Sequence, residues 1–104
     1  MKLRPDSKIK SEKCPLPDGG VIVRFDVLGK DFAIEESNRN VFRLDATGNE
    51  LWRVANHECL QGEDPFVGIN IAATGVVTGL TWDGWRFEIN PADGCLKKIG
   101  WTKS

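Results

Sequence analysis

The sequence predicts an all-β fold, an antiparallel meander of about eight short strands that forms a sandwich or a small barrel. Apolar and polar residues alternate over short runs such as VIVRFDV at 21–27, and a period of two is typical of strands with one buried face. Turn signals rich in Gly, Asp and Asn separate these runs. They recur about every 8–12 residues, a spacing typical of sandwiches and barrels.

Composition places the chain among ordinary single globular domains. Its 104 residues are 40% hydrophobic and 28% charged, with a formal net charge of −1. A balanced charge provides no general attraction to nucleic acid or to anionic membranes. No apolar run approaches the roughly 18 residues of a membrane span. We therefore expect no direct nucleic-acid binding and no membrane association.

The N-terminal segment and the cysteines bear on the compartment. The first ten residues, MKLRPDSKIK, are basic and lack the apolar region of a secretory signal. Cys14, Cys59 and Cys95 are odd in number and far apart, which argues against a disulfide framework. We expect free thiols and a cytoplasmic protein.

Proline and polar residues dominate the first part of the chain. Residues 1–17 contain three of the five prolines, and we predict an irregular N-terminal arm there, with room for one edge strand near Lys8–Lys10. Residues 18–104 are predicted to form a single β domain.

Within this domain we expect short strands, separated by polar loops at 35–40 and 56–65. The strands are predicted at 21–27, 32–34, 41–44, 51–55, 66–71, 76–82, 85–89 and 95–101. A helix over 50–60 is the competing interpretation, but its apolar residues form no continuous helical stripe.

The last two hairpins predict specific neighbours. A two-residue turn at Asp83-Gly84 would place Trp82 and Trp85 directly opposite each other on one face. Such a pair either packs in the core or forms an exposed aromatic platform, and the sequence leaves both open. The core is predicted to contain Phe87, Ile89, Leu96 and Ile99.

A weak internal repeat aligns residues 41–54 with residues 86–99. Its first copy, FRLDATGNELW, resembles the blade motif of pyrroloquinoline-quinone-type propeller proteins, and FEINPADGCL is a looser copy with Lys97 in place of the tryptophan. The resemblance implies structural roles for Gly48, Trp52 and Gly94. Two such units are too few for a propeller, which needs about four blades, although a propeller remnant that pairs with itself remains an alternative.

A second resemblance concerns function. The stretch 64–66, DPF, the stretch 81–86, TWDGWR, a closing hairpin and a C-terminal lysine are similar to features of small bacterial immunity proteins, including those of contact-dependent growth inhibition systems. The resemblance implies a non-enzymatic protein that binds and blocks a cognate toxin, often a nuclease.

Residues suited to catalysis are few. His57 is the single histidine, and we interpret it as a surface loop residue beside an incidental Cys59. His57, Glu58 and Cys59 do not have a zinc-ligand spacing, and no Cys-x-x-Cys pair is present. Neighbouring carboxylates in loops are usually solvated charge rather than an acid–base pair. We expect no enzyme activity, no metal site and no cofactor.

Acidic residues gather in two predicted loops, and they are the candidate partner-binding groups together with two tryptophans. The full set is Asp31, Glu35, Glu36, Glu58, Glu63, Asp64, Trp82 and Trp85. Acidic loops can occupy the phosphate-binding site of a basic nuclease, and complementary charge speeds encounter and sets specificity. The alternative interpretation is that these acidic groups only keep the protein soluble. A small-ligand or carbohydrate module that uses Trp82 and Trp85 is the alternative function.

Overall fold

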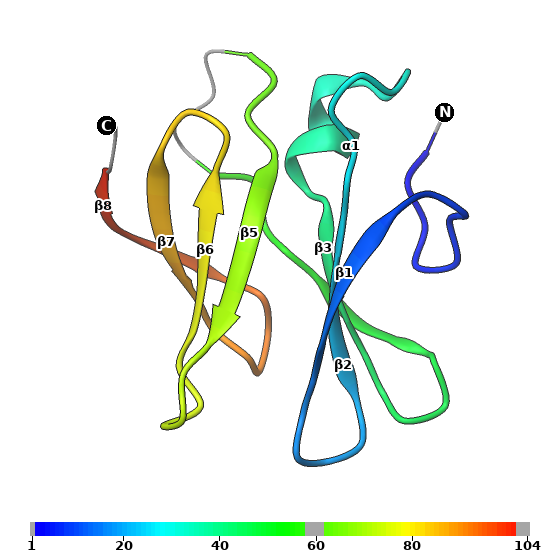
Figure 1. The fold of residues 1–104 in the computed structure, drawn as a ribbon, viewed down its shortest axis with the longest axis vertical. Helices are drawn as coiled ribbons and strands as arrows, with labels where there is room; N and C mark the ends of the chain where they lie inside the picture. Colours follow the sequence, from blue (N-terminus) through cyan, green and yellow to red (C-terminus); the bar gives the residue numbers. More distant parts are fainter. Residues whose placement is uncertain (1, 58–61, 102–104) are drawn as a thin grey trace.

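Two four-stranded antiparallel sheets form a sandwich in the computed structural model, which describes residues 2–57 and 62–101 (Figure 1). The first sheet has the order β1-β2-β3-β4 and the second β5-β6-β7-β8. The bounds are β1 (Ser11–Pro15), β2 (Val21–Phe25), β3 (Val41–Leu44), β4 (Glu50–Arg53), β5 (Phe66–Ile71), β6 (Val77–Thr81), β7 (Trp85–Ile89) and β8 (Leu96–Trp101). The all-β prediction is confirmed, as a sandwich without barrel closure among the described strands.

Four of the hairpins have the same type of loop. In each, three residues span the turn and the third is a glycine with a positive φ: Gly19, Gly48, Gly75 and Gly84. A tight turn followed by a left-handed residue is a frequent three-residue hairpin connection, and glycine adopts that conformation without steric cost. The glycines at these turn signals therefore set where each strand ends.

The N-terminal arm is part of the fold, so the predicted irregular arm is wrong for residues 11–15. These residues form β1 and pair with β2 from Ser11↔Phe25 to Pro15↔Val21. The predicted edge strand therefore lies a few residues beyond Lys8–Lys10. Polar residues and Pro15 are tolerated there because an edge strand has one unpaired side.

Both faces of the first sheet are buried. Ile22 faces the second sheet, while Val23, Phe25 and Phe42 lie on the opposite face in a second apolar cluster. Leu3, from the arm, covers that cluster and is itself buried. The alternation at 21–27 predicted only one buried face. Burial of the second face was not predicted, because the segment that covers it is the N-terminal arm, whose composition is mainly polar.

The connection from β2 to β3 differs from the prediction. β2 ends at Phe25, and the expected strand at 32–34 and loop at 35–40 are replaced by α1 (Ile34–Asn38), a single short helix. Three residues are too few to distinguish helical from strand periodicity. No helix within residues 2–57 and 62–101 is long and apolar enough to cross a membrane.

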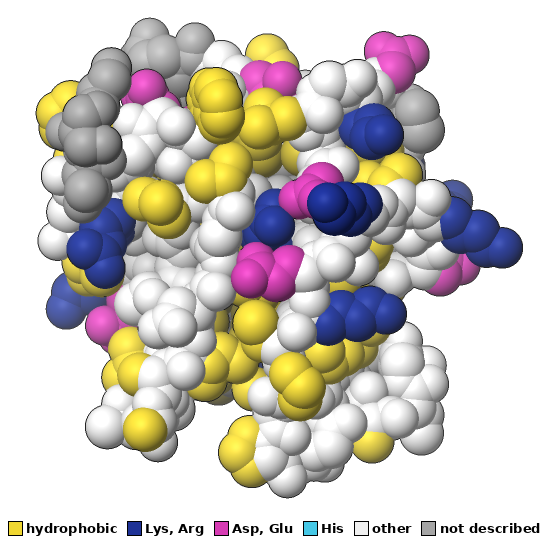
Figure 2. All heavy atoms as spheres, in the orientation of Figure 1, with side chains coloured by type: hydrophobic (Ala, Val, Ile, Leu, Met, Phe, Trp, Pro, Cys, Tyr) yellow, Lys and Arg dark blue, Asp and Glu magenta, His cyan; other side chains and the backbone are white. Residues whose placement is uncertain are grey.

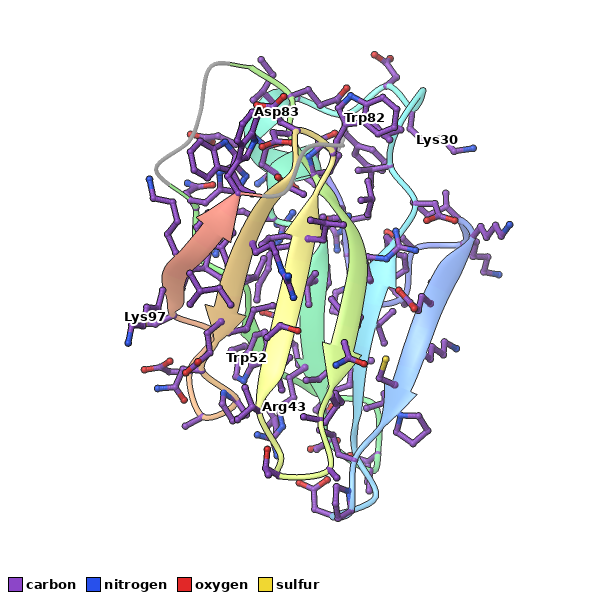
Figure 3. All side chains as sticks on the ribbon, turned by 60° about the vertical axis from the view of Figure 1, so that its left-hand side comes forward. Lys30, Arg43, Trp52, Trp82, Asp83 and Lys97 are labelled. Atoms are coloured by element: carbon purple, nitrogen blue, oxygen red, sulfur yellow. The ribbon has the colours of Figure 1, made fainter. Side chains whose placement is uncertain are left out.

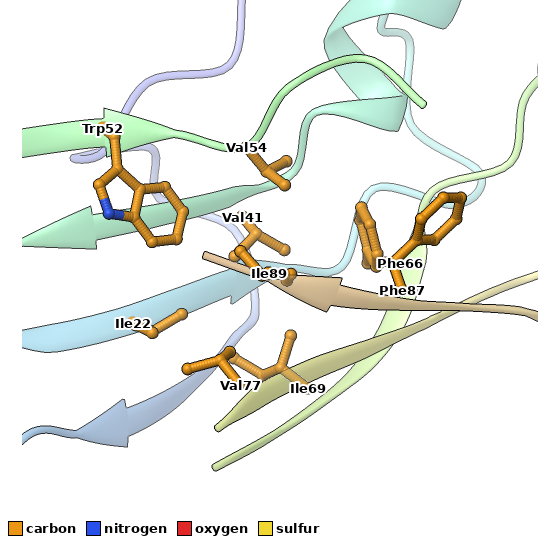
Figure 4. Close-up of a cluster of buried hydrophobic side chains, with 9 residues drawn as sticks. All are labelled: Ile22, Val41, Trp52, Val54, Phe66, Ile69, Val77, Phe87 and Ile89. Carbon is orange, nitrogen blue, oxygen red and sulfur yellow. The ribbon is translucent and has the colours of Figure 1, made fainter. Parts of the chain in front are cut away.

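The main core lies between the two sheets (Figure 4). It joins side chains of the first sheet, such as Val41, to Phe66, Phe87 and Ile89 of the second. The core predictions for Phe87 and Ile89 are confirmed, and Leu96 packs against the cluster from its edge. Ile99 is 46% exposed, so its assignment to the core is wrong. A β-bulge between β7 and β8 inserts Ile99 between the pairs Phe87↔Lys98 and Arg86↔Gly100, and a bulged residue leaves the regular alternation.

The two repeat-like hairpins meet in this core. The indole Nε1 of Trp52 donates a hydrogen bond to the carbonyl of Pro91 at 2.9 Å, and Gly94 lies against the indole face. The amide of Ala55 bonds to the carbonyl of Gly94 at 3.2 Å. Trp52 and Gly94 therefore fasten the end of β4 to the β7–β8 turn.

Candidate partner-binding surface

Three segments distant in sequence meet at one end of the sandwich: α1, residues 62–66 and the hairpin loop 82–84 (Figure 1). Asn38 joins the first two, because its Nδ2 donates to the Gly62 carbonyl at 3.1 Å and its Oδ1 accepts the Asp64 amide at 2.6 Å. The two segments predicted as acidic loops, 35–40 and 56–65, therefore lie side by side where the structure describes them, although most of the first is the helix α1.

Asp64 joins the third segment. Its carboxylate Oδ1 accepts a hydrogen bond from the backbone amide of Asp83 at 2.6 Å, and the neighbouring Trp82 amide bonds to the Pro65 carbonyl at 2.9 Å. Asp64 is buried, so the interpretation of this residue as a partner-contacting acid is wrong. Its role in this fold is to fix the hairpin loop.

Glu36 is also engaged internally. Its Oε1 accepts the Leu3 amide at 2.9 Å and lies 3.3 Å from Arg53 Nη1. Burial alone would raise the pKa of Glu36, but these two donors and the charge of Arg53 hold the pKa below its ordinary value. Glu36 ties the arm and α1 to β4, which removes it from the free acidic groups.

Three of the remaining predicted acids are at the surface. Asp31, Glu35 and Glu63 are exposed, and Glu63 Oε2 accepts a hydrogen bond from Ser37 Oγ at 2.5 Å, which orients its carboxylate over α1. Glu58 lies outside the described residues.

Trp82 and Trp85 do not form the predicted pair. The turn contains three residues, because the Gly84 amide bonds to the Thr81 carbonyl at 3.0 Å and Gly84 has a φ of 98°. Trp82 is consequently part of the loop and is 66% exposed. The platform expected from these two side chains is not formed.

Trp85 instead opposes Trp101 across β7 and β8. Their ring centroids lie 6.0 Å apart at an interplanar angle of 43°, and Lys98 Nζ lies 4.6 Å from the Trp85 ring centroid. Trp101 Nε1 donates to the Asp83 carbonyl at 2.8 Å, which holds the hairpin loop from its other side. The sequence analysis missed this pairing because it depends on the bulge in β8.

The exposed groups at this end define what we call the loop-end surface: Asp31, Ile34, Glu35, Glu63 and Trp82. Its apolar members are the exposed side chains of Ile34 and Trp82. Hydrophobic and acidic side chains lie next to one another at the upper end of Figure 2. Figure 3 places Trp82, Asp83 and Lys30 at the same end of the molecule. Ile34 was missed because it was assigned to a strand.

The residues considered for metal binding and catalysis are placed as follows. No group of three or more His, Cys, Asp or Glu within residues 2–57 and 62–101 is placed to hold a metal ion. His57 is only 2% exposed, so its interpretation as a surface residue is wrong. Its aromatic ring packs against Phe66 and Phe87, which a loop position in the sequence does not reveal. Cys59 lies outside the described residues.

Comparison with known proteins gives a family. The model of DUF7957, a domain of unknown function, matches residues 12–101. The chain belongs to this family. The DUF7957 match begins in β1 and ends with β8, so it spans both sheets of the sandwich. No curated protein and no solved structure matches the chain.

Proposed function

We propose that this DUF7957 chain is a non-enzymatic protein-binding module that uses its loop-end surface to bind a partner protein. The observation that carries the proposal is the position of Trp82. Trp82 is 66% exposed, although its own amide donates to the Pro65 carbonyl and the amide of the neighbouring Asp83 donates to the Asp64 carboxylate. A large aromatic side chain on a fixed backbone is a typical anchor of a protein interface, because it buries much area while the backbone loses little conformational entropy on binding.

Charge around this anchor indicates the nature of the partner. Asp31, Glu35 and Glu63 are exposed acids on the loop-end surface, and Figure 3 shows one cation, Lys30, at the same end of the molecule. A surface with surplus negative charge favours a partner with a basic patch, and it accelerates their encounter.

The most specific form of the proposal is an immunity protein that neutralises a bacterial toxin, with a basic nuclease as the favoured target. In this mechanism, Trp82 anchors the complex while Glu35 and Glu63 occupy positions that substrate phosphates take in the nuclease. The sandwich itself contributes rigidity, since the hairpin loop is held by Asp64 and by Trp101. Catalytic chemistry is not required of the chain.

A pull-down with matched baits tests the proposal. The tagged chain, the double variant Trp82→Ala/Glu63→Lys and the control Leu51→Ala are incubated with extract of the native host. Leu51 is 54% exposed on β4 and lies outside the loop-end surface. We expect one stoichiometric partner that the wild type and the control retain and the double variant loses.

Two results would contradict the proposal. If the double variant retains the partner, the loop-end surface is not the interface. If no stoichiometric partner is captured by any bait, the protein-binding function itself is wrong. For a captured nuclease domain, inhibition of its activity by an equimolar amount of the chain tests the immunity mechanism directly.

A further inference from the structure

A hollow of about 280 Å³ lies on the outer face of the second sheet, the face turned away from the core. Residues of β5, β6 and β7 line it, among them Gly68, Asn70, Thr78, Leu80 and Arg86. None of these residues belongs to the loop-end surface. Sites for drug-sized ligands have volumes of about 300–1,000 Å³, so the hollow suits a small molecule with a single ring.

Strand pairing explains where the hollow lies. Gly68 opposes Leu80, and Leu80 opposes Arg86, in one row across the three strands, while Asn70 opposes Thr78 in the next row. Directly opposed residues share a face of the sheet, and these positions alternate with the core positions of the same strands. Nothing lies within 4 Å of a Cβ atom added at Gly68. A glycine inside a strand often marks a place where a ligand approaches the backbone closely.

The side chains around the hollow present accessible polar groups beside an apolar one. Arg86 and Asn70 are exposed, and Thr78 is half-buried. Within residues 2–57 and 62–101, the Arg86 guanidinium forms no hydrogen bond and no ion pair. A guanidinium can bind a carboxylate through two parallel hydrogen bonds. Leu80 is 39% exposed, so an apolar surface lies next to this charge.

Glu88 is an acidic residue on the same face of the sheet. It opposes Thr78 on one side and Lys97 on the other, and it does not line the hollow. Opposite charges directly across a strand pair attract each other, so Lys97 compensates the Glu88 carboxylate. The positive charge of Arg86 therefore remains for a ligand.

We infer that this hollow binds a hydroxylated six-membered ring with one carboxylate, the chemistry of a uronic acid. The carboxylate pairs with the Arg86 guanidinium, and the carbon–hydrogen face of the ring lies against Leu80 and the backbone at Gly68. The ring hydroxyls bond to the side-chain amide of Asn70 and the hydroxyl of Thr78, since all of these groups can donate and accept. Separate groups thus recognise the charge, the ring and the hydroxyls.

The experiment is an NMR titration of the full chain with glucuronate as the probe. We expect saturable shifts of the Gly68 backbone amide, the Asn70 side-chain amide and the Arg86 Nε–H signal. Two comparators separate the contacts, because glucose lacks the carboxylate and cyclohexanecarboxylate lacks the hydroxyls. Each should bind about tenfold more weakly, the factor for about 1.4 kcal/mol. A comparator that binds as tightly as glucuronate would overturn the inferred ligand chemistry.

Arg86 and Lys97 provide a matched pair of variants, because each change to glutamine removes one positive charge from the same face. Arg86→Gln should weaken glucuronate binding by about tenfold or more through the lost charge-assisted hydrogen bonds. Lys97→Gln should weaken it much less, because Lys97 lies on the edge strand β8 and does not line the hollow (Figure 3). Equal effects would show that only diffuse surface charge attracts the probe, and would overturn the inference.

Gly68→Val fills the hollow without removing a charge. Gly68 does not have a positive φ, its site has room for a Cβ atom, and valine favours strands, so the variant should unfold at or above the wild-type temperature. It should lose the saturable shifts. Unchanged binding by this variant, or no saturable shift of the wild type at millimolar glucuronate, would overturn the inference. No partner protein takes part, so the outcome is separate from that of the pull-down.

Discussion

The side-chain amide of Asn40 bonds to both backbone polar groups of Phe66. Its Nδ2 donates to the Phe66 carbonyl at 2.8 Å, and its Oδ1 accepts the Phe66 amide at 3.0 Å. The same Nδ2 also donates to the Phe25 carbonyl at 2.8 Å. Asn40 precedes β3 and Phe66 begins β5, so one buried side chain acts as a strand partner that joins the two sheets. It also positions residues 62–66, beneath the loop-end surface.

Replacing Asn40 with alanine should therefore be strongly destabilising. The variant leaves an amide and two carbonyls without this partner, and each unpaired buried group costs about 1–3 kcal/mol. We expect a loss of about 3 kcal/mol or more in the free energy of unfolding, measured by urea denaturation. Asn70→Ala, at an exposed position of β5, is the control and should stay within about 0.5 kcal/mol. Similar values for the two variants would contradict a joining role for Asn40.

The second prediction concerns Gly94, where a positive φ and close packing against Trp52 both favour glycine. Its φ is 79°, and a Cβ atom added there would lie 2.6 Å from Cε3 of the Trp52 indole. Gly94→Ala must therefore displace the indole and weaken the bond from Trp52 Nε1 to Pro91. We expect a loss of about 3 kcal/mol or more, from backbone strain together with disrupted core packing.

Gly48→Ala separates these two contributions. Gly48 has a φ of 90°, but nothing lies within 4 Å of an added Cβ. This control should lose only the conformational part, about 1 kcal/mol. Urea denaturation of both variants gives the difference. If Gly94→Ala costs no more than Gly48→Ala, the contact with Trp52 does not constrain the hairpin.

Much of the fold follows from local sequence signals. The glycine-containing turns and the alternating runs at 41–44, 66–71 and 85–89 correspond to observed strands, because hairpin geometry is determined by a few adjacent residues. The helix α1 and the burial of Leu3 were not predicted. Both depend on contacts with distant segments, such as the bond from the Leu3 amide to Glu36.

The candidate site was predictable only in part. The sequence showed that acidic residues gather in two segments, but it could not show that these segments lie side by side or that Asp64 and Glu36 are used internally. A carboxylate in a polar stretch has the same local signature whether it faces solvent or binds a backbone amide. The pairing of Trp85 with Trp101 was missed for a related reason, since a one-residue bulge changes which side chains are opposed.

Tryptophan substitutions should distinguish packing from surface roles. Trp82→Ala is expected to change the free energy of unfolding by less than about 0.5 kcal/mol, because its side chain is largely exposed. Trp52→Ala should cost about 3–5 kcal/mol, because Trp52 is buried and bonded to Pro91. Thermal or urea unfolding of both variants provides the measurement. A cost above about 1 kcal/mol for Trp82→Ala would mean that this residue supports the fold, and the loop-end surface would lose its proposed anchor.

The stability of the chain should depend on pH through Glu36. Its pKa in the folded state is below the ordinary value, which is about 4.3 in an unfolded chain. The folded protein therefore binds this proton less readily than the unfolded chain does. The stabilising contribution is fully present above the unfolded pKa and is lost as pH falls through the folded pKa.

The variant Glu36→Gln isolates this contribution, because the glutamine amide is neutral throughout and can still accept the Leu3 hydrogen bond. We expect the wild type to have the higher Tm at about pH 6, and the difference in Tm to shrink as the pH falls below the unfolded-state pKa of about 4.3. The pKa values of Asp18 and Asp45 are also lowered, by hydrogen bonds from Gly20 and Thr47 respectively, but both groups titrate equally in the two proteins. Scanning calorimetry across this range checks the result. A difference in Tm that is independent of pH would show that the carboxylate charge of Glu36 does not stabilise the contact between the arm, α1 and β4.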